Sequence, residues 1–553
     1  MKVLINCLNS KFIHASLAPW CLYSGVKNFC KNQVDVKVIE STINNDISYH
    51  IDKIIKENPD IVSFSTYIWN VEKTFEICKE VKKQLNCTIL VGGPEVSYRA
   101  KNVLSENEFI DYVLCGEGEE TFPEFIDKFH SNNHFDVAGL CYRHNGEIIE
   151  NPEKEYTGTP PTPYCDEFYD NLKGRISYIE SSRGCPFRCA FCLSGRCSKL
   201  RFFDMELVKK EILDLSVSGT QTIKFVDRTF NANAERANEI YSFIIENYGK
   251  KIPQGVCFHF EIAGDILKES TMKILESAPK GAIQLEIGMQ TFNEDTLRAI
   301  NRTTNTEKLI NNIKRLISFE NMHIHIDLIA GLVNEDMKSF ERSFNIGYGL
   351  KADMLQMGFL KLLYGAEMRE NPQKFPCTFT ENPPYEVTET PWLSRHDVKS
   401  LKKCEDALER LYNSGRFILT LDYLIDECNF EPFKLFMEFG KAVDGTNMRL
   451  SEYAEKLYNF FKNRVEKDLL REKIVCDLLS CASGVQLPDC LKVKDKRYKQ
   501  IKKLFQENSH HKYQIAILYK TEQVFVVNQS TPKDKKGRYK GEYYNFSEFD
   551  FFE

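Results

Sequence analysis

The sequence has no long apolar run, no signal-peptide core and no surplus of basic charge. Its longest apolar stretches are strand-sized, which is too short for a membrane-spanning helix. The N-terminus has one early lysine and lacks the apolar core of a secretory signal, so we expect a cytoplasmic protein. Its 73 basic and 79 acidic residues give a net charge of -6, which argues against non-specific nucleic-acid binding without excluding a local basic site.

The composition is otherwise that of an ordinary soluble protein. The 553 residues exceed what one compact core can hold, so we expect two to four domains. Apolar residues make up 42% and charged residues 27%, which excludes a mainly disordered chain, a collagen and a coiled-coil rod. The 19 cysteines are odd in number and widely spread, which does not indicate a disulfide framework.

Strand-like and helix-like segments alternate in the first part of the chain. Repeated β–α units predict a mostly parallel, doubly wound sheet whose ligands bind beyond the carboxyl ends of the strands. No G-x-G-x-x-G follows the first strand, so the NAD and FAD fingerprint is absent. An Asn145-Gly146 hairpin and the proline-rich linker 158–163 follow. The expected strands are Val3–Asn6, Val36–Ile39, Ile61–Ser65, Thr88–Val91 and Tyr112–Cys115.

A second β–α region follows, and a different composition ends the chain. Six expected strands predict a partial (β/α)6 barrel with its active face at the strand carboxyl ends. Prolines return at 372–391, and helical segments with one pair of strands then predict a mainly helical α+β region. We therefore expect domains at 1–155, 165–375 and 380–553. The six strands are Ile176–Glu180, Thr222–Asp227, Val256–Ile262, Ile283–Met289, His323–Ile329 and Leu355–Leu360.

Three cysteines lie close together after the first strand of the middle region. Cys185, Cys189 and Cys192 form the pattern C-x-x-x-C-x-x-C. Three thiolates facing one point can hold an iron–sulfur cluster and leave one iron open to another ligand. Zinc, with Cys197 as fourth ligand, is the competing metal, and three unrelated buried cysteines are the third interpretation. The spacing favours the cluster.

This spacing, with an aromatic residue just before the third cysteine, resembles the radical S-adenosylmethionine (SAM) superfamily. Further blocks at 225–231, 258–262, 286–293, 301–304, 327–332 and 358–362 extend the resemblance. It implies a [4Fe–4S] cluster on the three cysteines, SAM chelated to the open iron, and reduction to a 5′-deoxyadenosyl radical. It also implies a reductant such as flavodoxin or ferredoxin. By this resemblance the SAM contacts are Phe191, Glu261, Gln290, Arg302 and Asp327.

Elementary chemistry agrees with part of this set. Arg302 is able to pair with the carboxylate of SAM. Glu261 and Asp327 lie within apolar strands, where an unpaired carboxylate is costly, so both need a partner.

Four further blocks, at 16–20, 63–70, 91–98 and 115–122, lie on strand-end loops of the first region. They resemble the cobalamin (B12)-binding domain that precedes the radical SAM domain in one large subclass. The D-x-H-x-x-G motif is missing, so we expect cobalamin without a histidine below the cobalt, and interpret His14 as a loop histidine. The expected cobalamin contacts are Ser65, Thr66, Gly92, Gly93, Pro94, Glu95, Ser97, Gly116, Glu117 and Gly118.

The resemblance implies an enzyme that methylates an unactivated carbon, using the radical and methylcobalamin. The alternative is oxidation, cyclisation or rearrangement with the same cofactors, and a non-enzymatic sensor is a third reading. The substrate is not identified by the sequence. The last region resembles an uncharacterised accessory domain. Its basic runs, 492–503 and 533–540, are expected to be solvated surface, with binding of phosphates or single-stranded nucleic acid as the alternative.

Overall fold

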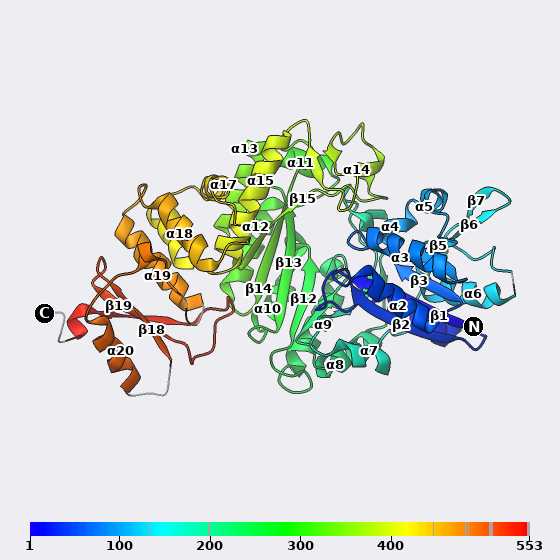
Figure 1. Ribbon diagram of the computed structural model, residues 1–553, viewed down its shortest axis with the longest axis horizontal. Helices are drawn as coiled ribbons and strands as arrows, with labels where there is room; N and C mark the ends of the chain where they lie inside the picture. Colours follow the sequence, from blue (N-terminus) through cyan, green and yellow to red (C-terminus); the bar gives the residue numbers. More distant parts are fainter. Residues whose placement is uncertain are drawn as a thin grey trace. The chain divides into compact units, whose positions relative to one another are not determined.

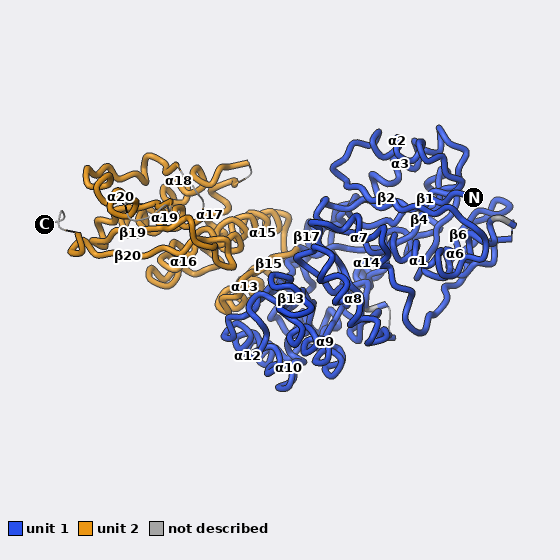
Figure 2. The backbone as a smooth tube through the Cα atoms, turned by 90° about the horizontal axis from the view of Figure 1, so that it is seen from below, with its two compact units in different colours: residues 1–335, 359–392 blue, residues 336–358, 393–553 orange. Residues whose placement is uncertain are grey.

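The computed structural model describes residues 1–131, 133–196, 199–445, 447–481, 484, 486–507 and 512–549. The chain folds as two compact units (Figure 2). Unit 1 comprises residues 1–335 and 359–392, and unit 2 comprises residues 336–358 and 393–553. Unit 1 therefore contains the first β–α region and the second as far as residue 335. None of the helices in these described ranges is long and apolar enough to cross a membrane.

The first sheet of unit 1 has seven strands in the order β2-β1-β3-β4-β5-β6-β7 (Figure 1). Strands β1 to β5 run parallel, and the hairpin β6–β7 adds two antiparallel strands, which confirms the predicted doubly wound fold. The strand order reverses between β1 and β3, which makes this edge the switch point where ligands bind. The strands are Lys2–Asn9, Asp35–Thr42, Ile61–Ser65, Thr88–Gly92, Tyr112–Leu114, Leu140–His144 and Glu147–Glu150.

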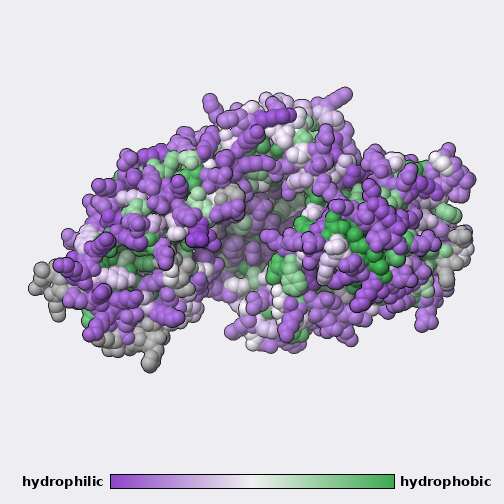
Figure 3. Space-filling view, in the orientation of Figure 1, coloured by the Kyte–Doolittle hydropathy of each residue, from purple (hydrophilic) through white to green (hydrophobic). Residues whose placement is uncertain are grey.

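Six helices cover this sheet, whose central strands are buried on both faces. Strand β3 is buried at every position, as expected for a parallel strand between two helical layers. Hydrophobic residues also gather in patches on the visible surface over this N-terminal part, where most other residues are polar (Figure 3). The helices are α1 (Ala18–Phe29), α2 (Ile47–Glu57), α3 (Val71–Gln84), α4 (Pro94–Ser97), α5 (Ala100–Glu106) and α6 (Gly118–His130).

The second sheet has six strands in the order β15-β14-β13-β12-β11-β8, which confirms the predicted partial barrel. Strands β8 and β11 to β14 are parallel. The strands are β8 (Ser177–Ile179), β11 (Thr222–Phe225), β12 (Cys257–Ile262), β13 (Ile283–Gln290), β14 (His323–Ala330) and β15 (Met354–Phe359). The helices along this part are α7 (Asp166–Leu172), α8 (Met205–Val217), α9 (Ala234–Asn247), α10 (Glu269–Glu276), α11 (Glu294–Ala299) and α12 (Thr306–Ser318).

Two short antiparallel ladders in unit 1 are absent from the sequence prediction. Strand β9 (Ser182–Arg183) pairs with β10 (Arg201–Phe202), and β16 (Thr378–Phe379) pairs with β17 (Val387–Glu389). Two-residue strands carry no periodic signal, so sequence patterns do not reveal them. The first ladder encloses the cysteine loop.

Unit 2 is mainly helical with one small sheet, which confirms the predicted α+β class. Its three antiparallel strands are β18 (Tyr513–Leu518), β19 (Gln523–Asn528) and β20 (Gly541–Asn545), the last of which the sequence did not predict. Ser394 and Asp397 form a capping box that starts α15. The longer helices are α13 (Met337–Gly349), α15 (Arg395–Leu408), α17 (Pro432–Ala442), α18 (Leu450–Phe461), α19 (Lys467–Cys481) and α20 (Tyr498–Glu507).

Candidate functional site

The cysteine loop is anchored at its start by buried polar contacts. Asp227, directly beyond β11, is 1% exposed and accepts hydrogen bonds from the Ser181 backbone N–H at 2.9 Å and the Ser182 Oγ at 2.5 Å. Gly184 has φ of +94°, and a Cβ there would lie 2.4 Å from the Lys199 carbonyl oxygen. Only glycine fits this crossing, so the backbone immediately before Cys185 is held in one place.

Cys185, Cys189 and Cys192 follow within this anchored loop. Cys189 is buried, whereas the other two are partly exposed. Cys185 Sγ lies 3.4 Å from Thr229 Oγ1, and Arg302 Nη1 lies 3.7 Å from Cys189 Sγ. Burial raises the pKa of the Cys189 thiol, against the opposing charge of Arg302. Cys197, the alternative zinc ligand, lies outside the described residues.

A cavity of about 200 Å³, called here the first cavity, opens at the carboxyl ends of β11 to β14. Four of the predicted SAM residues line it: Glu261, Gln290, Arg302 and Asp327. Phe191 is placed differently, because it packs against the hydrophobic cluster that contains Ala190 and Leu332. Phe187, also in the cysteine loop, lines the cavity instead. The remaining lining residues are Arg228, Thr229, Ile262, Ala263, Asp265, Glu286, Gly288, Thr303 and Thr304.

The backbone is distorted where β13 reaches the first cavity. Gln290 has φ of +67°, and the register with β14 shifts between Gly288 and Gln290. Arg302 Nη2 donates to the Gly288 carbonyl oxygen at 2.6 Å. A Cβ on Gly288 would lie 2.2 Å from Gln290 Nε2, so a larger residue there would displace the Gln290 amide. Bulges and left-handed non-glycine residues concentrate at functional sites, where they aim side chains.

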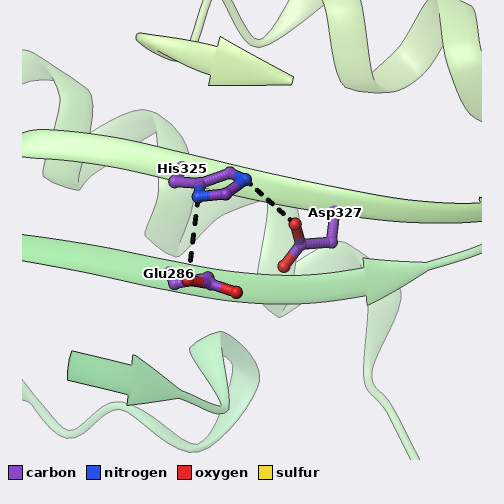
Figure 4. A group of neighbouring side chains, drawn as sticks. All are labelled: Glu286, His325 and Asp327. Carbon is purple, nitrogen blue, oxygen red and sulfur yellow. Dashed lines mark ion pairs between the residues drawn. The ribbon is translucent and has the colours of Figure 1, made fainter. Parts of the chain in front are cut away.

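Alternation along three neighbouring strands gathers ionisable side chains on the inner face of the barrel. Glu286 on β13 lies between two imidazoles on its neighbours: its Oε2 is 3.0 Å from His259 Nε2 and 3.8 Å from His325 Nδ1, the second of which is drawn in Figure 4. His325 Nε2 then lies 3.0 Å from Asp327 Oδ1. Residues two apart on a strand share a face, which places His259 with Glu261 and His325 with Asp327.

Burial and pairing shift the pKa values within this group. Burial raises the pKa of Asp327, and burial together with the charge of Glu286 raises the pKa of Glu261 to about 7. Burial acts on His325 in the opposite direction, but the Asp327 carboxylate outweighs it and raises the imidazole pKa. Burial also opposes the charged form of Glu286, yet the two imidazoles hold the pKa of this carboxyl below its usual value.

The donor atoms of Glu286, His325 and Asp327 lie within 4.8 Å of one another, as a metal site would require. The two ring nitrogens of His325, however, face different carboxylates (Figure 4). One imidazole nitrogen binds one ion, so this geometry fits a chain of ion pairs better than a single metal. Sequence reasoning assigned no role to His259, Glu286 or His325, although the two-residue spacing from Glu261 and Asp327 was available as a signal.

A larger cavity of about 590 Å³, the second cavity, lies beyond the carboxyl ends of β1, β3, β4 and β5. Six of the predicted cobalamin residues line it: Ser65, Gly92, Gly93, Gly116, Glu117 and Gly118. Its walls include many apolar side chains, among them Leu17, Leu22, Phe64, Tyr67, Trp69, Leu90 and Phe122. Tyr67 and Trp69 stack with ring centroids 4.4 Å apart. His14 also lines the cavity, with its Nδ1 2.6 Å from the Tyr178 hydroxyl.

The other four predicted cobalamin residues do not line the second cavity, and their contact with the cofactor stays a prediction. Thr66 Oγ1 donates to the Gly92 carbonyl oxygen at 2.7 Å, and Ser97 Oγ donates to that of Gly93 at 2.9 Å. Glu95 is buried and accepts a hydrogen bond from the Tyr385 hydroxyl, while Pro94 begins α4. These side chains stabilise the loops by contacts within the protein. A sequence motif does not show whether a residue has this role or contacts a ligand.

The second cavity is shared between the two sheets of unit 1. Tyr178, Glu180, Arg183, Val226 and Arg228, all from the barrel side, complete its wall. Arg183, two residues before Cys185, pairs with Glu119 at 2.5 Å and with Glu180 at 2.8 Å, and also contacts Glu117. The cysteine loop and the loop after β5 are therefore joined directly.

Arg228 lines the first cavity as well as the second. It follows Asp227, so the contact that anchors the cysteine loop also fixes the backbone of this shared wall. The sequence prediction quoted this stretch without giving Arg228 a role. One side chain thus borders both candidate binding sites.

Three sequence families match successive parts of the chain. The B12 binding domain matches residues 24–126, and the radical SAM superfamily matches residues 179–345. Residues 373–531 match a protein family of unknown function, DUF4080. The chain combines a B12-binding domain, a radical SAM domain and a DUF4080 domain.

Curated relatives of this B12-binding radical SAM protein carry two kinds of name. An uncharacterized methyltransferase of Pyrococcus horikoshii is 26% identical over 59% of this chain and 72% of its own length. The cobalamin-dependent radical SAM methyltransferase TokK of Streptomyces tokunonensis is 27% identical over 51% of this chain. An anaerobic magnesium-protoporphyrin IX monomethyl ester cyclase of Cereibacter sphaeroides is 22% identical over 55% of this chain. The chain spans 44% of the length of TokK and 51% of the cyclase.

Solved structures show the same fold. The cobalamin-dependent SAM radical enzyme OxsB, with aqua-cobalamin bound, superposes with a TM-score of 0.62 at 15% identity. The match covers 86% of this chain and 78% of that chain. At this identity the similarity establishes the fold alone.

Proposed function

We propose that this protein is a cobalamin-dependent radical SAM methyltransferase that methylates an unactivated carbon of its substrate. The observation that carries the proposal is the wall that the two cavities share at Arg228. Transfer between two bound groups needs close contact at one substrate carbon. Two cavities that share the lining residue Arg228 support such an approach within unit 1.

The residues of the first cavity fit SAM beside a cluster on Cys185, Cys189 and Cys192. Arg302 is suited to the carboxylate of SAM, and its buried Nε has no hydrogen-bond partner among the described residues. Glu261 and Asp327 supply carboxylates for the amino group and the ribose hydroxyls. Both carboxylates line the cavity next to the distorted end of β13, which aims Gln290 into the same space.

The residues of the second cavity fit a large, mostly apolar macrocycle. Its apolar side chains exclude water, and the loops after β4 and β5 present backbone for a polar tail. When bound, the cofactors would supply a 5′-deoxyadenosyl radical for hydrogen abstraction and a methyl group for transfer. The protein itself positions the two binding sites on either side of Arg228 and pairs the buried charges of both sites.

The alternative is an oxidation, cyclisation or rearrangement that uses the same cofactors without methyl transfer. The similarity to the magnesium-protoporphyrin ester cyclase supports it. The two cavities accommodate either reaction, because the fold alone does not choose between them.

Anaerobic incubation of the reconstituted protein with methyl-labelled SAM and a reductant separates the two reactions. Methyl transfer produces both 5′-deoxyadenosine and S-adenosylhomocysteine, whereas the alternative produces the first without the second. Flavodoxin or ferredoxin is the proposed physiological reductant, and the cytoplasm is the proposed location. Absence of both products in the presence of substrate extracts would contradict the assignment as a radical SAM enzyme.

A further inference from the structure

A basic groove lies in unit 2, within the family of unknown function. Five lysines line it, Lys492, Lys494, Lys496, Lys499 and Lys502, and its volume is about 980 Å³. The whole chain has a net charge of -6, so this concentration of positive charge is local. Local fields of one sign in a hollow attract ligands of the opposite sign.

The acidic residue of the groove does not cancel this charge. Asp495 lines the groove, but its Oδ2 is 2.9 Å from Arg497 Nη2, and it also accepts a hydrogen bond from the Tyr519 hydroxyl. Lys492 pairs with Asp489 at 2.6 Å in an exposed contact, which is worth little in water. The groove therefore presents a surplus of ammonium groups.

Helix α20 explains why two of these lysines, Lys499 and Lys502, face the groove. Ile501 is 0% exposed in a hydrophobic cluster, and Phe505 packs against the same cluster. These side chains fix one face of the helix against strand β18. Lys499 and Lys502 are three residues apart on another face, so their side chains are neighbours. Most of these lysines are exposed, in line with the predicted solvated surface, and they also line a hollow.

The floor of the groove is not charged. Tyr498 is 37% exposed and Val493 is 36% exposed, and both also line a small adjoining cavity of about 60 Å³. Gln514 on β18 lines the groove, and its buried amide oxygen has no hydrogen-bond partner among the described residues. An aromatic ring, an apolar recess and an unsatisfied amide suit a planar, hydrogen-bonding group.

We propose that this groove of unit 2 binds single-stranded nucleic acid, with its phosphates on the lysines and an unpaired base on Tyr498. A positive groove with a stacking aromatic is how proteins bind single strands without sequence preference. A duplex keeps its bases paired and stacked inside, so it has no free base that can stack on Tyr498. An acidic protein would use the lysines but leave the aromatic recess and the Gln514 amide without a partner.

Fluorescence anisotropy of the full-length protein with labelled single-stranded RNA, single-stranded DNA and a matched duplex tests this proposal. The groove variant combines Lys494→Gln, Lys496→Gln and Lys499→Gln. The matched control removes the same charge at exposed lysines elsewhere in unit 2, with Lys399→Gln, Lys441→Gln and Lys467→Gln. A third protein carries Arg at the three groove positions.

We expect the wild type to bind a single strand tightly and the groove variant to bind it about 100-fold more weakly at roughly 0.1 M salt, since each phosphate contact contributes about -0.7 to the salt slope. The control and the Arg variant should bind within about threefold of wild type. Tyr498→Ala should weaken single-strand binding by about fivefold or more, and Tyr498→Phe should restore it.

Several results would overturn the inference. One is equal affinity of the groove variant and the control, and another is the absence of saturable binding by the wild type. Equal affinity for the duplex with no effect of Tyr498→Ala would remove the single-strand assignment. Displacement of the oligonucleotide by poly-glutamate of equal charge and equal affinity would assign the groove to an acidic protein instead. These readouts do not depend on methyl transfer.

Discussion

The two cavities of unit 1 differ in both size and lining. The first is small, and its lining includes the ionisable residues Arg228, Glu261, Asp265, Glu286, Arg302 and Asp327. The second is larger, and apolar side chains with stacked aromatics form much of its wall. Buried charge is tolerated only where it is paired, so the first cavity is matched to a ligand with charges of its own. The second cavity is matched to a large ligand with an apolar surface.

The two cavities are also built differently. Alternate residues of adjacent strands provide much of the first, including Glu261, Glu286 and Asp327. The second also takes residues from helices, such as Cys21 and Leu22 on α1, beside strand ends such as Ser65 and turns such as Gly116–Glu117. Replacing a strand residue of the first cavity should therefore weaken the binding of one ligand. Replacing Arg228, which lines both cavities, should weaken the binding of both.

The largest expected difference between the two sites comes from replacing a cysteine of the cysteine loop. Cys185→Ala should abolish the iron–sulfur absorbance and all SAM cleavage, because three thiolates are the minimum for a site-differentiated cluster. Cobalamin binding, measured by absorbance titration, should stay within about threefold of wild type, since Cys185 does not line the second cavity.

Cys257→Ala is the matched control, as that partly exposed thiol lies on β12 outside the loop. Cys197→Ala should also retain both the cluster and SAM cleavage. Retained iron and activity in Cys185→Ala would contradict the assignment of this thiol.

The next largest effect concerns the joint between the two sheets. Glu40 and Arg175 form an ion pair of 2.7 Å, with side chains 7% and 6% exposed. Glu40→Gln leaves the guanidinium buried without a charge partner, which typically costs about 3–5 kcal/mol. We expect a lower free energy of unfolding by chemical denaturation and weaker cobalamin binding.

Glu40 accepts a hydrogen bond from the Ser16 N–H at 3.1 Å, and Ser16 lines the second cavity. Neither residue of the pair lines the first cavity, so SAM affinity of folded Glu40→Gln protein should change little. Glu294→Gln, which removes an exposed partner of Arg298, provides a control that should unfold like the wild type. Equal losses of SAM and cobalamin affinity would show that the pair supports the whole unit and not the joint alone.

Arg228→Leu tests the shared wall itself. Removing a charged contact from each site should weaken SAM and cobalamin by about tenfold each, or about 1.4 kcal/mol per site. Methyl transfer should then fall by about 100-fold, because the two losses multiply when the contacts are independent. Isothermal titration calorimetry with each cofactor separately measures the loss of SAM affinity and the loss of cobalamin affinity. Arg315→Leu, at an exposed ion pair, is the control. Weakening of only one cofactor would assign Arg228 to a single cavity.

The sequence predicted most of the fold because strands of both sheets carry strong apolar patterns. Ile61–Ser65 was placed with the bounds that the structure gives β3. The two-residue strands around the cysteine loop were missed, because so short a ladder is set by tertiary contacts such as Asp227 with Ser181. The prolines at 372–391 lie just before the break between the units at Trp392 and Leu393, but no sequence pattern indicates that residues 336–358 fold with unit 2.

The candidate site was predicted unevenly for a physical reason. Residues on strands, such as Glu261 and Asp327, lie where period-two alternation places them, and both line the first cavity. Loop residues such as Thr66 and Glu95 stand in the same motif blocks as cavity residues but bond within the protein. A loop has no fixed period, so sequence alone does not tell which of its side chains face a ligand.

A smaller effect is expected from the ionisation of Glu261. Burial raises its pKa to about 7, with Glu286 adding to this and Arg228 and Lys224 opposing it. Below that pH the carboxyl is neutral and loses its attraction for cationic SAM, so SAM affinity should fall by about tenfold between about pH 8 and pH 6. Equilibrium dialysis across this range measures the effect.

Glu261→Gln should bind SAM more weakly at pH 8 and show a nearly flat profile. His325 titrates nearby, since the Asp327 carboxylate raises its pKa, so His325→Gln serves as the companion variant. That variant should retain the pH dependence if Glu261 is responsible. A profile flattened by His325→Gln and unchanged by Glu261→Gln would assign the titration to the imidazole instead.

The smallest expected effect is at His14 in the second cavity. Burial and the charges of Lys224, Lys11 and Arg175 lower its pKa, so the imidazole is neutral near pH 7, a form that binds metals. Its Nδ1 is held by the Tyr178 hydroxyl at 2.6 Å, and the following residue is tied to the barrel by the Ala15 N–H bond to the Ile176 carbonyl oxygen. A ring fixed from both backbone and side chain lacks the freedom to turn onto cobalt.

His14→Ala should therefore leave the cobalt(II) spectrum without imidazole hyperfine splitting and unchanged from wild type, with cobalamin affinity altered by less than about threefold. A changed cobalt signal would make His14 an axial ligand, and the apolar second cavity would then hold its cofactor by a metal bond as well as by shape.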